Sequence, residues 1–178
     1  LMEQKKELKK GLIQKLLTGE VRLPGFEGVW KKVRLGNIGK TYNGLSGKSA
    51  EDFGEGKPYI AYKTIFDDSK IDINKLDYVR IEENEKQNKA KYGDIFFTTS
   101  SETPDEVGMS SVLLDHIDEV YLNSFCFGYR LNDFNVLHPE FAQYLFRSNG
   151  FRKKTLSLAQ GSTRFNISKN EVMKIEVL

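Results

Sequence analysis

The sequence predicts an α+β domain: a mixed, mostly antiparallel sheet of short strands comes first, and helices follow late in the chain. Three observations predict this class. Short segments rich in Val, Ile, Tyr, Phe and Thr lie between residues 32 and 131, helical patterns follow only after residue 138, and a separate leucine stripe occupies residues 1–17. Strands followed by helices are typical of α+β domains, whereas repeating βαβ units would alternate them.

The N-terminal segment is predicted to be a helix over residues 1–17. One face carries an apolar stripe and lysines cover the other face. The stripe consists of Leu1, Leu8, Leu12 and Leu16. Gly19 follows as a C-cap candidate, and Pro24 lies soon after it. Because an apolar stripe needs a partner, two interpretations stay open: the helix packs on its own domain, or it is part of a spacer or coiled coil.

The chain divides into three parts. Residues 1–18 form the helix, residues 19–29 form a linker with proline and glycine breakers, and residues 30–178 form the main domain. Within that domain, strands are expected at 32–38, 58–62, 78–81, 94–100, 111–114 and 120–131. Helices are expected at 138–148 and 151–160.

The last element has clear start signals. Ser168 and Glu171 have the spacing of a capping box, in which each side chain accepts a backbone N–H of the other residue. Ile167 and Val172 flank the box at the positions of a hydrophobic staple. We therefore expect a short helix directly after residue 168 and a final strand at 174–178.

Composition restricts the class of protein. A chain of 178 residues with 39% hydrophobic and 12% aromatic residues can bury one core. The charged fraction of 29% and the mean hydropathy of −0.49 predict a soluble protein with no membrane partner. A single cysteine, Cys126, cannot form an internal disulfide, which favours the reducing cytoplasm.

Charge is unevenly distributed, although the formal net charge is only +2. Residues 141–170 contain no acidic residue. The same window holds the basic residues Arg147, Arg152, Lys153, Lys154, Arg164 and Lys169. Acidic residues concentrate instead in 51–77 and 82–85. This distribution predicts one basic and one acidic face, and a basic face suits an anionic partner.

The sequence contains no complete motif for nucleotide or metal binding. Gly47-Lys48-Ser49 resembles the end of a phosphate loop, but Tyr42 stands where that motif requires a glycine. His116 and His138 have no ligand-spaced partners. We therefore expect no metal and no cofactor on this chain.

Catalytic motifs are also lacking. Cys126 lies within an aromatic strand, as a core residue would. Pro104-Asp105 is not followed by the acid-x-Lys of metal-dependent nucleases, and the Asn/Asp-Pro-Pro-aromatic tetrad of amino-methyltransferases does not occur. The sequence therefore predicts a binding protein and not an enzyme.

Two polar stretches are candidates for the binding surface. In 96–108 a strand runs out into several hydroxyl side chains, and 160–166 combines an amide, hydroxyls and Arg164. Such groups suit phosphate oxygens and base edges. The alternative, that each stretch is an ordinary solvated loop, stays open at this point.

The chain resembles the specificity subunit of type I restriction-modification systems. Five stretches carry the resemblance: EQKKELKKGLIQKLLTGEVRLPGF (3–26), WKKVRLGNIGKTYNG (30–44), KYGDIFFTTS (91–100), YLNSFCFGYRL (121–131) and QGSTRFNISKNEVMKIEV (160–177). Their order covers nearly the whole chain. The resemblance implies that 1–18 ends a conserved spacer helix and that 30–178 has the target-recognition-domain fold.

The resemblance also implies a function and partners. Such a domain reads one half of a bipartite site in double-stranded DNA and directs adenine methylation and cleavage by other subunits. The partners are adenine-methyltransferase (modification) subunits and, through them, a restriction subunit. The spacer helix pairs with another helix of the parent subunit or of a second copy. With a single such domain, the chain is expected to be a fragment or a half-subunit.

The residues expected to contact DNA come from several segments. They are Lys48, Lys63, Thr99, Ser100, Ser101, Arg152, Lys153, Lys154, Gln160, Ser162, Thr163 and Arg164. Arg164 is expected on a phosphate or a guanine edge, and Arg152, Lys153 and Lys154 on phosphates. The leucine stripe and the low net charge leave an alternative open, a protein-interaction scaffold without specific DNA readout. A third hypothesis is a member that fuses recognition with cleavage.

Overall fold

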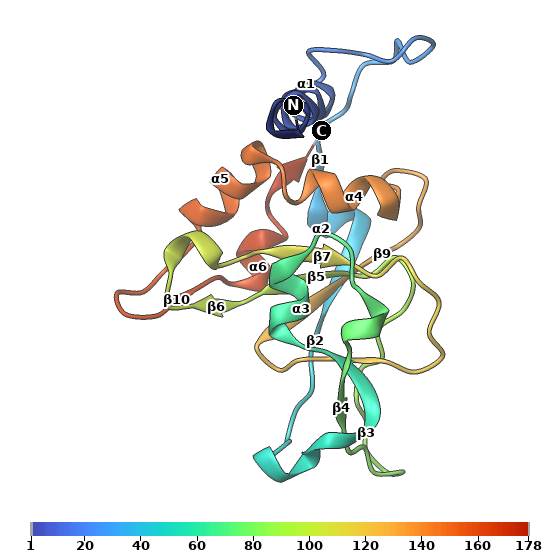
Figure 1. The fold of residues 1–178 in the computed structure, drawn as a ribbon, viewed down its shortest axis with the longest axis vertical. Helices are drawn as coiled ribbons and strands as arrows, with labels where there is room; N and C mark the ends of the chain where they lie inside the picture. The colour runs from blue at the N-terminus through green and yellow to red at the C-terminus, as the bar shows by residue number, and fades with distance from the viewer. Residues whose placement is uncertain (1, 178) are drawn as a thin grey trace.

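The computed structural model describes residues 2–177 and confirms the α+β class (Figure 1). The helices are α1 (Met2–Thr18), α2 (Leu35–Ile38), α3 (Tyr62–Asp67), α4 (Pro139–Leu145), α5 (Asn149–Ser157) and α6 (Lys169–Val172), with 3-10 turns η1 (Ala50–Asp52), η2 (Ile73–Lys75) and η3 (Pro104–Glu106). The strands are β1 (Val33–Arg34), β2 (Gly39–Asn43), β3 (Phe53–Ile60), β4 (Asp77–Val79), β5 (Ile95–Thr98), β6 (Ser100–Ser101), β7 (Ser110–Val112), β8 (Tyr121–Leu122), β9 (Cys126–Leu131), β10 (Phe165–Asn166) and β11 (Glu176–Val177).

Within residues 2–177 the strands form four small sheets. The central sheet has the order β2-β9-β5-β7 and is antiparallel throughout. A second sheet, β4-β3-β8, includes one parallel pair, β3 with β8. Its strands β3 and β4 lie at the lower end of the molecule in Figure 1. The pairs β1–β11 and β6–β10 complete the set. The expected mixed, mostly antiparallel arrangement is therefore confirmed.

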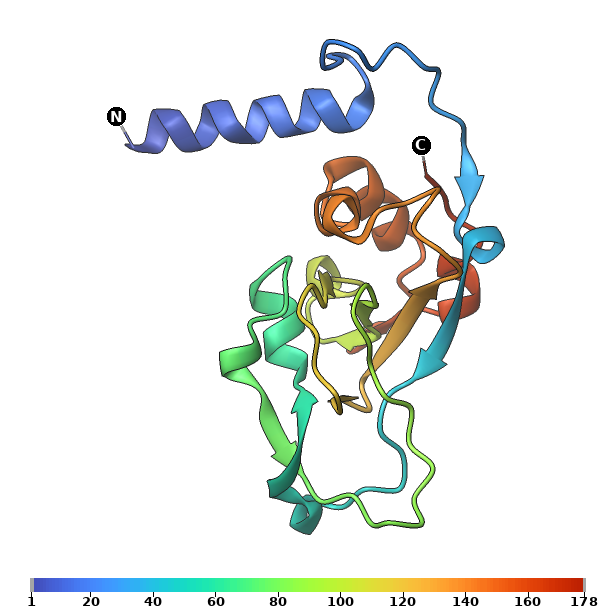
Figure 2. The ribbon, with the colours of Figure 1, turned by 90° about the vertical axis from the view of Figure 1, so that its right-hand side faces the viewer.

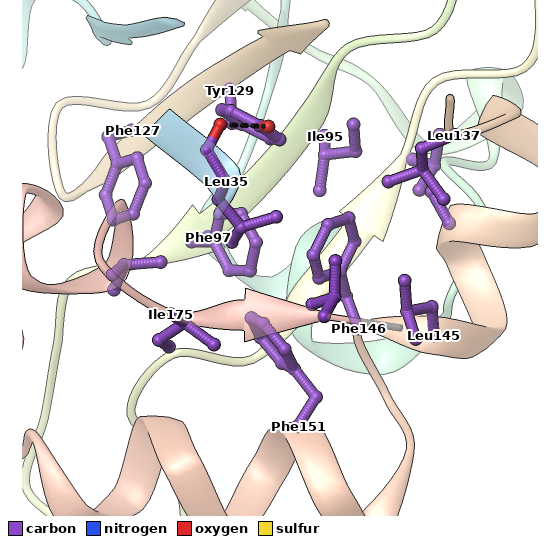
Figure 3. Packing of buried hydrophobic residues seen from close by; sticks show 14 of the residues in the cluster. Leu35, Ile95, Phe97, Phe127, Tyr129, Leu137, Leu145, Phe146, Phe151 and Ile175 are labelled. Atoms are coloured by element: carbon purple, nitrogen blue, oxygen red, sulfur yellow. Dashed lines mark hydrogen bonds between the residues drawn. The ribbon is translucent and has the colours of Figure 1, made fainter. Parts of the chain in front are cut away.

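The main hydrophobic core lies between the central sheet and the helices α4 and α5 (Figure 3). Phe97 is fully buried, and its ring centroid lies 5.2 Å from that of Phe127 and 5.4 Å from that of Phe146. Tyr129 is also buried and donates its hydroxyl to the carbonyl of Leu35 at 2.8 Å. This bond satisfies the phenol inside the core and fixes α2 to the sheet.

β5 is buried on both faces. Phe97 faces the main core, while its neighbour Phe96 belongs to a second cluster that includes Ile60, Ile65 and Leu122. Successive side chains of a strand point to opposite faces, so β5 joins the two clusters. The segments that extend from its end are consequently held by a rigid central strand.

A buried carboxylate locks the turn that leads into β5. Asp94 is 1% exposed and accepts two hydrogen bonds from Arg130, at 2.8 and 2.7 Å. It also accepts the Tyr42 hydroxyl at 2.6 Å and the Lys91 amide at 2.9 Å. The Tyr42 ring lies across Gly128, where an added Cβ would come within 2.2 Å of the ring. One carboxylate thus ties β2, β9 and the start of β5 together.

Three segments differ from their predicted structure. Residues 32–38 were expected as one strand, but Leu35 turns into the core and residues from there on form α2. Tyr62 begins α3 and does not end a strand. The predicted strand 120–131 is interrupted at residues 123–125, where the Asn123 side chain accepts the Phe125 amide at 2.8 Å. Such a local side-chain bond stabilises a turn in preference to a ladder.

The short helix α6 begins where expected, but not through a capping box. The Ser168 side chain makes no capping hydrogen bond within residues 2–177. Ile167 and Val172 are both buried in the main core, so apolar packing holds the start of α6. The interpretation of Ser168 and Glu171 as a capping box is therefore wrong.

The N-terminal helix is confirmed, and its apolar residues separate into two groups. Leu17 is buried and the last turns of α1 contact α4, whereas Leu8 and Leu12 are 74% and 50% exposed. Leu1, the first residue of the predicted stripe, lies outside the described residues. Figure 2 shows that α1 extends beyond the edge of the domain. No helix within residues 2–177 is long and apolar enough to cross a membrane.

An apolar groove of about 490 Å³ runs between α1, the linker and α4. Its lining includes Leu16, Phe26 and Trp30. The Trp30 ring packs edge-on against Phe141 at 6.2 Å, and the Arg22 guanidinium lies 4.7 Å from the Trp30 centroid. α1 therefore packs on its own domain at one end and keeps apolar surface free at the other.

We expect the stability of the β4-β3-β8 sheet to fall in acid because of Glu119. This carboxylate forms ion pairs with Lys57 at 2.6 Å and with Lys89 at 2.8 Å. It also accepts a hydrogen bond from the Tyr121 hydroxyl at 2.8 Å. The bonds from Lys57, then Lys89 and Tyr121, lower the pKa of Glu119 to about 2, from 4.5. Because the pKa of Glu119 is lower in the folded protein than in the unfolded chain, the ionised carboxylate contributes stability above about pH 4.5. This contribution to stability is lost as the pH falls toward about 2.

This dependence is testable by urea unfolding between pH 6 and pH 2. Glu119→Gln is expected to remove the part of the stability loss that falls between about pH 4.5 and pH 2. Tyr121→Phe deletes only one of the bonds and should give an intermediate curve. Identical pH curves for the wild type and Glu119→Gln would contradict the assignment.

Candidate nucleic-acid interface

The two polar stretches singled out in the sequence form one structure. β6 pairs antiparallel with β10, so that Ser101 faces Phe165 and Ser100 faces Asn166. The Ile167 amide extends the pairing by donating to the Thr99 carbonyl at 2.9 Å. Figure 1 shows this pair at one side of the molecule, ending in a free loop. We call β6, β10, residues 102–103 and residues 161–164 the polar ribbon.

The loop of the polar ribbon is closed by its own backbone. The Gln160 amide donates to Asn166 at 2.9 Å, and the Asn166 amide returns a bond at 2.8 Å. Gly161 has a φ of 137°, and a Cβ there would come within 2.0 Å of the Arg164 carbonyl oxygen. Only glycine fits this turn. The turn leaves the side chains of Ser162 and Thr163 exposed.

A pocket of about 530 Å³ opens beside the polar ribbon, and we call it the ribbon pocket. It is lined by Tyr62, Ser100, Ser101, Glu102, Thr103, Glu106, Phe125 and Arg164. Phe125 is 59% exposed, and the Tyr62 hydroxyl donates to the Ser100 carbonyl at 2.9 Å. Burial raises the pKa of Tyr62, so its hydroxyl stays protonated at neutral pH. The Ser100 hydroxyl is buried and lacks a hydrogen-bond partner among residues 2–177.

Charged groups at the ribbon pocket are mostly acidic. Glu106 accepts the Ser101 hydroxyl at 2.9 Å, and Ser101 in turn accepts the Thr103 amide at 3.1 Å, which fixes the carboxylate. Arg164 forms an ion pair with Glu102 at 3.2 Å. The two side chains of that pair are 56% and 78% exposed, so the pair contributes little to stability and can accept further partners.

The arginines of the acid-free window are largely used inside the domain. Arg152 donates to the carbonyls of Val107 at 2.9 Å and Asp105 at 2.7 Å, holding η3 at the pocket wall. Arg147 donates to the carbonyls of Ser110, Ile65, Phe66 and Asp68. Burial lowers the pKa of both arginines. The window therefore supplies less free positive charge than its composition indicates.

The remaining predicted residues lie in varied surroundings. Thr99 donates its hydroxyl to the Phe125 carbonyl. Lys63 on α3 and Lys153 on α5 are exposed, and their side-chain ammonium groups form no hydrogen bond or ion pair with another residue of 2–177. Lys154 donates to the Glu176 carbonyl at 2.6 Å. Lys48 lies between β2 and η1, where it pairs with Glu85, and it is not among the residues that line the ribbon pocket.

The structure thus brings Thr99, Ser100, Ser101 and the 160–164 loop together. Sequence reasoning missed the other lining residues, Tyr62, Glu102, Thr103, Glu106 and Phe125. Glu102 and Glu106 lie within the stretch 96–108, which was selected for its hydroxyl side chains, and Thr103 is one of those hydroxyl residues. No local pattern identifies Tyr62 or Phe125, because their placement depends on pairing between distant segments.

We expect Arg152→Ala to lower the free energy of unfolding by about 2 kcal/mol. The carbonyls of Asp105 and Val107 would lose their donor. Because Val107 is buried, its unsatisfied carbonyl costs about 1–3 kcal/mol, whereas Asp105 is exposed and can bond to water. Lys153→Ala, one residue away and exposed, is the matched control and should change stability little. Urea unfolding of both variants tests this, and equal losses would show that Arg152 does not hold η3.

No protein-family model and no curated protein matches the chain. Solved structures do match. The chain superposes on the S subunit of a type I restriction-modification system from M. genitalium with a TM-score of 0.55 at 13% identity, covering 88% of this chain and 36% of that one. The HsdS subunit from Thermoanaerobacter tengcongensis gives a TM-score of 0.59 at 17% identity, with coverages of 99% and 40%.

A third match is a chain from a structural study of complex assembly and conformational transition in the type I restriction-modification system. It has a TM-score of 0.57 at 19% identity, with coverages of 99% and 44%. At these identities the similarity establishes the fold: this chain has the fold found in type I specificity subunits, as the five sequence stretches predicted. The chain spans about two fifths of the length of these solved chains.

Proposed function

We propose that the chain is a sequence-specific DNA-recognition domain that reads one half of a bipartite site for a type I restriction-modification complex. The polar ribbon carries the proposal, because it joins the two stretches that the sequence indicates into one exposed surface. Hydroxyls, carboxylates and an arginine on such a surface suit base edges. The shared fold with type I S subunits supports the same function.

Chemistry in this proposal belongs to partner subunits. The chain itself is non-catalytic and has no cofactor, while modification subunits methylate adenine and a restriction subunit joins through them. The free part of α1, with Leu8 and Leu12 exposed, pairs with another helix of the parent subunit or of a second copy. Lys63 and Lys153, both exposed, supply general phosphate attraction.

A protein-interaction scaffold without specific readout is the second candidate. The apolar groove beside α1 and the exposed leucines favour it, since such surfaces mark protein contacts. The two candidates differ in what they predict for DNA. A scaffold predicts weak binding that is indifferent to sequence, whereas a recognition domain predicts enrichment of defined sequences.

The test is selection of duplexes from a random pool by the full parent subunit with its modification partners. The proposed function predicts enrichment of a split sequence and a fall in affinity with salt, with a log–log slope of about −0.9 for each phosphate contact. A bound pool without any sequence preference would refute specific recognition and support the scaffold.

A further inference from the structure

We propose that the Arg164–Glu102 ion pair reads a single G·C base pair in the major groove. The inference rests on the proposed function and assigns a particular base pair to the polar ribbon. Arg164 donates to the guanine and the Glu102 carboxylate accepts the cytosine amino group. The sequence predicts that Arg164 contacts either a phosphate or a guanine edge. The shape and the charge of the polar ribbon favour the guanine edge.

The shape of the polar ribbon suits the groove. A two-stranded β-ribbon fits the major groove of B-DNA, as an α-helix does. β6 and β10 form such a ribbon, and its backbone-closed loop holds Arg164 at the free end. Arg164 and Glu102 are also more than half exposed, so a base edge can reach both without unfolding the loop.

The charge around Arg164 disfavours a phosphate. The charged residues that line the ribbon pocket are two carboxylates, Glu102 and Glu106, and one guanidinium, Arg164, which pairs with Glu102. Lys63 and Lys153 are not among the lining residues. The pocket is therefore negative, and like charges brought together at an interface weaken binding. Base edges carry no net charge, and the amino groups of cytosine and adenine are donors that a carboxylate can accept.

The pair itself matches G·C. Arginine binds guanine O6 and N7 with two N–H groups, and a carboxylate accepts the N4 amino group of cytosine. Arg164 uses Nη2 on Glu102 at 3.2 Å, which leaves the other guanidinium N–H groups for guanine. Because Glu102 touches Arg164, both side chains reach the two bases of one pair. A·T would leave Arg164 facing an adenine amino group, a donor against a donor.

The test is competition binding by the parent complex with duplexes that vary one base pair at a time. Wild type is expected to require G·C at one position within its half-site. Arg164→Ala and Glu102→Ala should each lose about 5- to 150-fold discrimination at that same position. Arg164→Ala should leave the salt slope unchanged, since no phosphate contact is removed.

The exposed Lys174–Glu171 ion pair provides the matched control. Lys174→Ala and Glu171→Ala should leave discrimination unchanged at every position. The inference is overturned if Arg164→Ala weakens all sequences alike and lowers the salt slope by about one, or if the two variants affect different positions. It is also overturned if the control variants lose the same discrimination. A wild type without any sequence preference would refute the proposed function instead.

Discussion

Asp94→Ala is expected to lower the free energy of unfolding by about 3 kcal/mol. The substitution removes a carboxylate that is 1% exposed and leaves Arg130, the Tyr42 hydroxyl and the Lys91 amide without their acceptor. Breaking a buried ion pair costs about 3–5 kcal/mol, and we expect the lower end because the Arg130 side chain is 39% exposed and can regain water. Urea unfolding of the chain measures the loss.

A double-mutant cycle identifies the source of that loss. Arg130→Met alone is also destabilising, but in the Asp94→Ala background it should cost about 1–2 kcal/mol less, because the two residues share one network. Glu55→Ala, which breaks the exposed pair with Arg80, is the control and should have a much smaller effect. Additive losses for Asp94 and Arg130 would show that the ion pair is not what stabilises the turn.

Phe97→Ala is expected to cost about 3–5 kcal/mol, the range for truncating a buried aromatic residue. The ring is 0% exposed and contacts Phe127 of β9, Phe146 directly after α4, and Phe151 of α5. The cavity would lie at the point where the sheet meets both helices, so the surrounding elements cannot all move in to fill it. Thermal and urea unfolding should agree on the loss.

Phe97→Leu separates cavity formation from loss of aromatic contacts. Leucine keeps much of the apolar volume, so we expect a clearly smaller loss than for alanine. Phe125→Ala offers the exposed counterpart: Phe125 is 59% exposed, and its truncation should leave stability nearly unchanged. A loss for Phe125→Ala as large as that for Phe97→Ala would contradict the placement of the core.

Local patterns predicted most of the fold because the main elements carry their own signals. The α+β order, α1, α4, α5 and the strand β5 follow from periodicity and residue type. α3 was missed for a physical reason. Its residues are aromatic and β-branched, as in a strand, but Ile65 is buried and Arg147 satisfies the carbonyls at the end of the helix. Tertiary packing overrides propensity there.

The candidate site was predictable only in part. Residue types singled out Ser100, Ser101 and the loop around Arg164, but the pairing of β6 with β10 joins segments far apart in the sequence. Arg152 shows a second limit of prediction from residue type: the sequence indicates a free charge where the side chain is used inside the domain. A lysine or arginine in an acid-free window indicates free charge, and only the structure shows that Arg152 is used on the carbonyls of η3.

The structure divides into a rigid core and an exposed polar ribbon, which suits the recognition role that we propose. The core around Phe97 and the Asp94 network hold the central sheet, and the polar ribbon extends from the end of β5. Side chains of the ribbon loop can change without touching the core, because Ser162 and Thr163 are exposed and only Gly161 is required by the turn. Under the proposed function, specificity and stability would therefore depend on different residues.

The most direct measurement is a map of methylated adenines in a genome that carries the parent system. Two forms are compared. One is the wild type, and the other is a variant in which Ser162 is replaced by glycine and Thr163 and Arg164 are each replaced by glycine or serine, while Gly161 is kept. The account predicts a split motif for wild type, and for the variant a change or loss of specificity in one half while the other half is retained. An unchanged motif in the variant would contradict recognition by the polar ribbon.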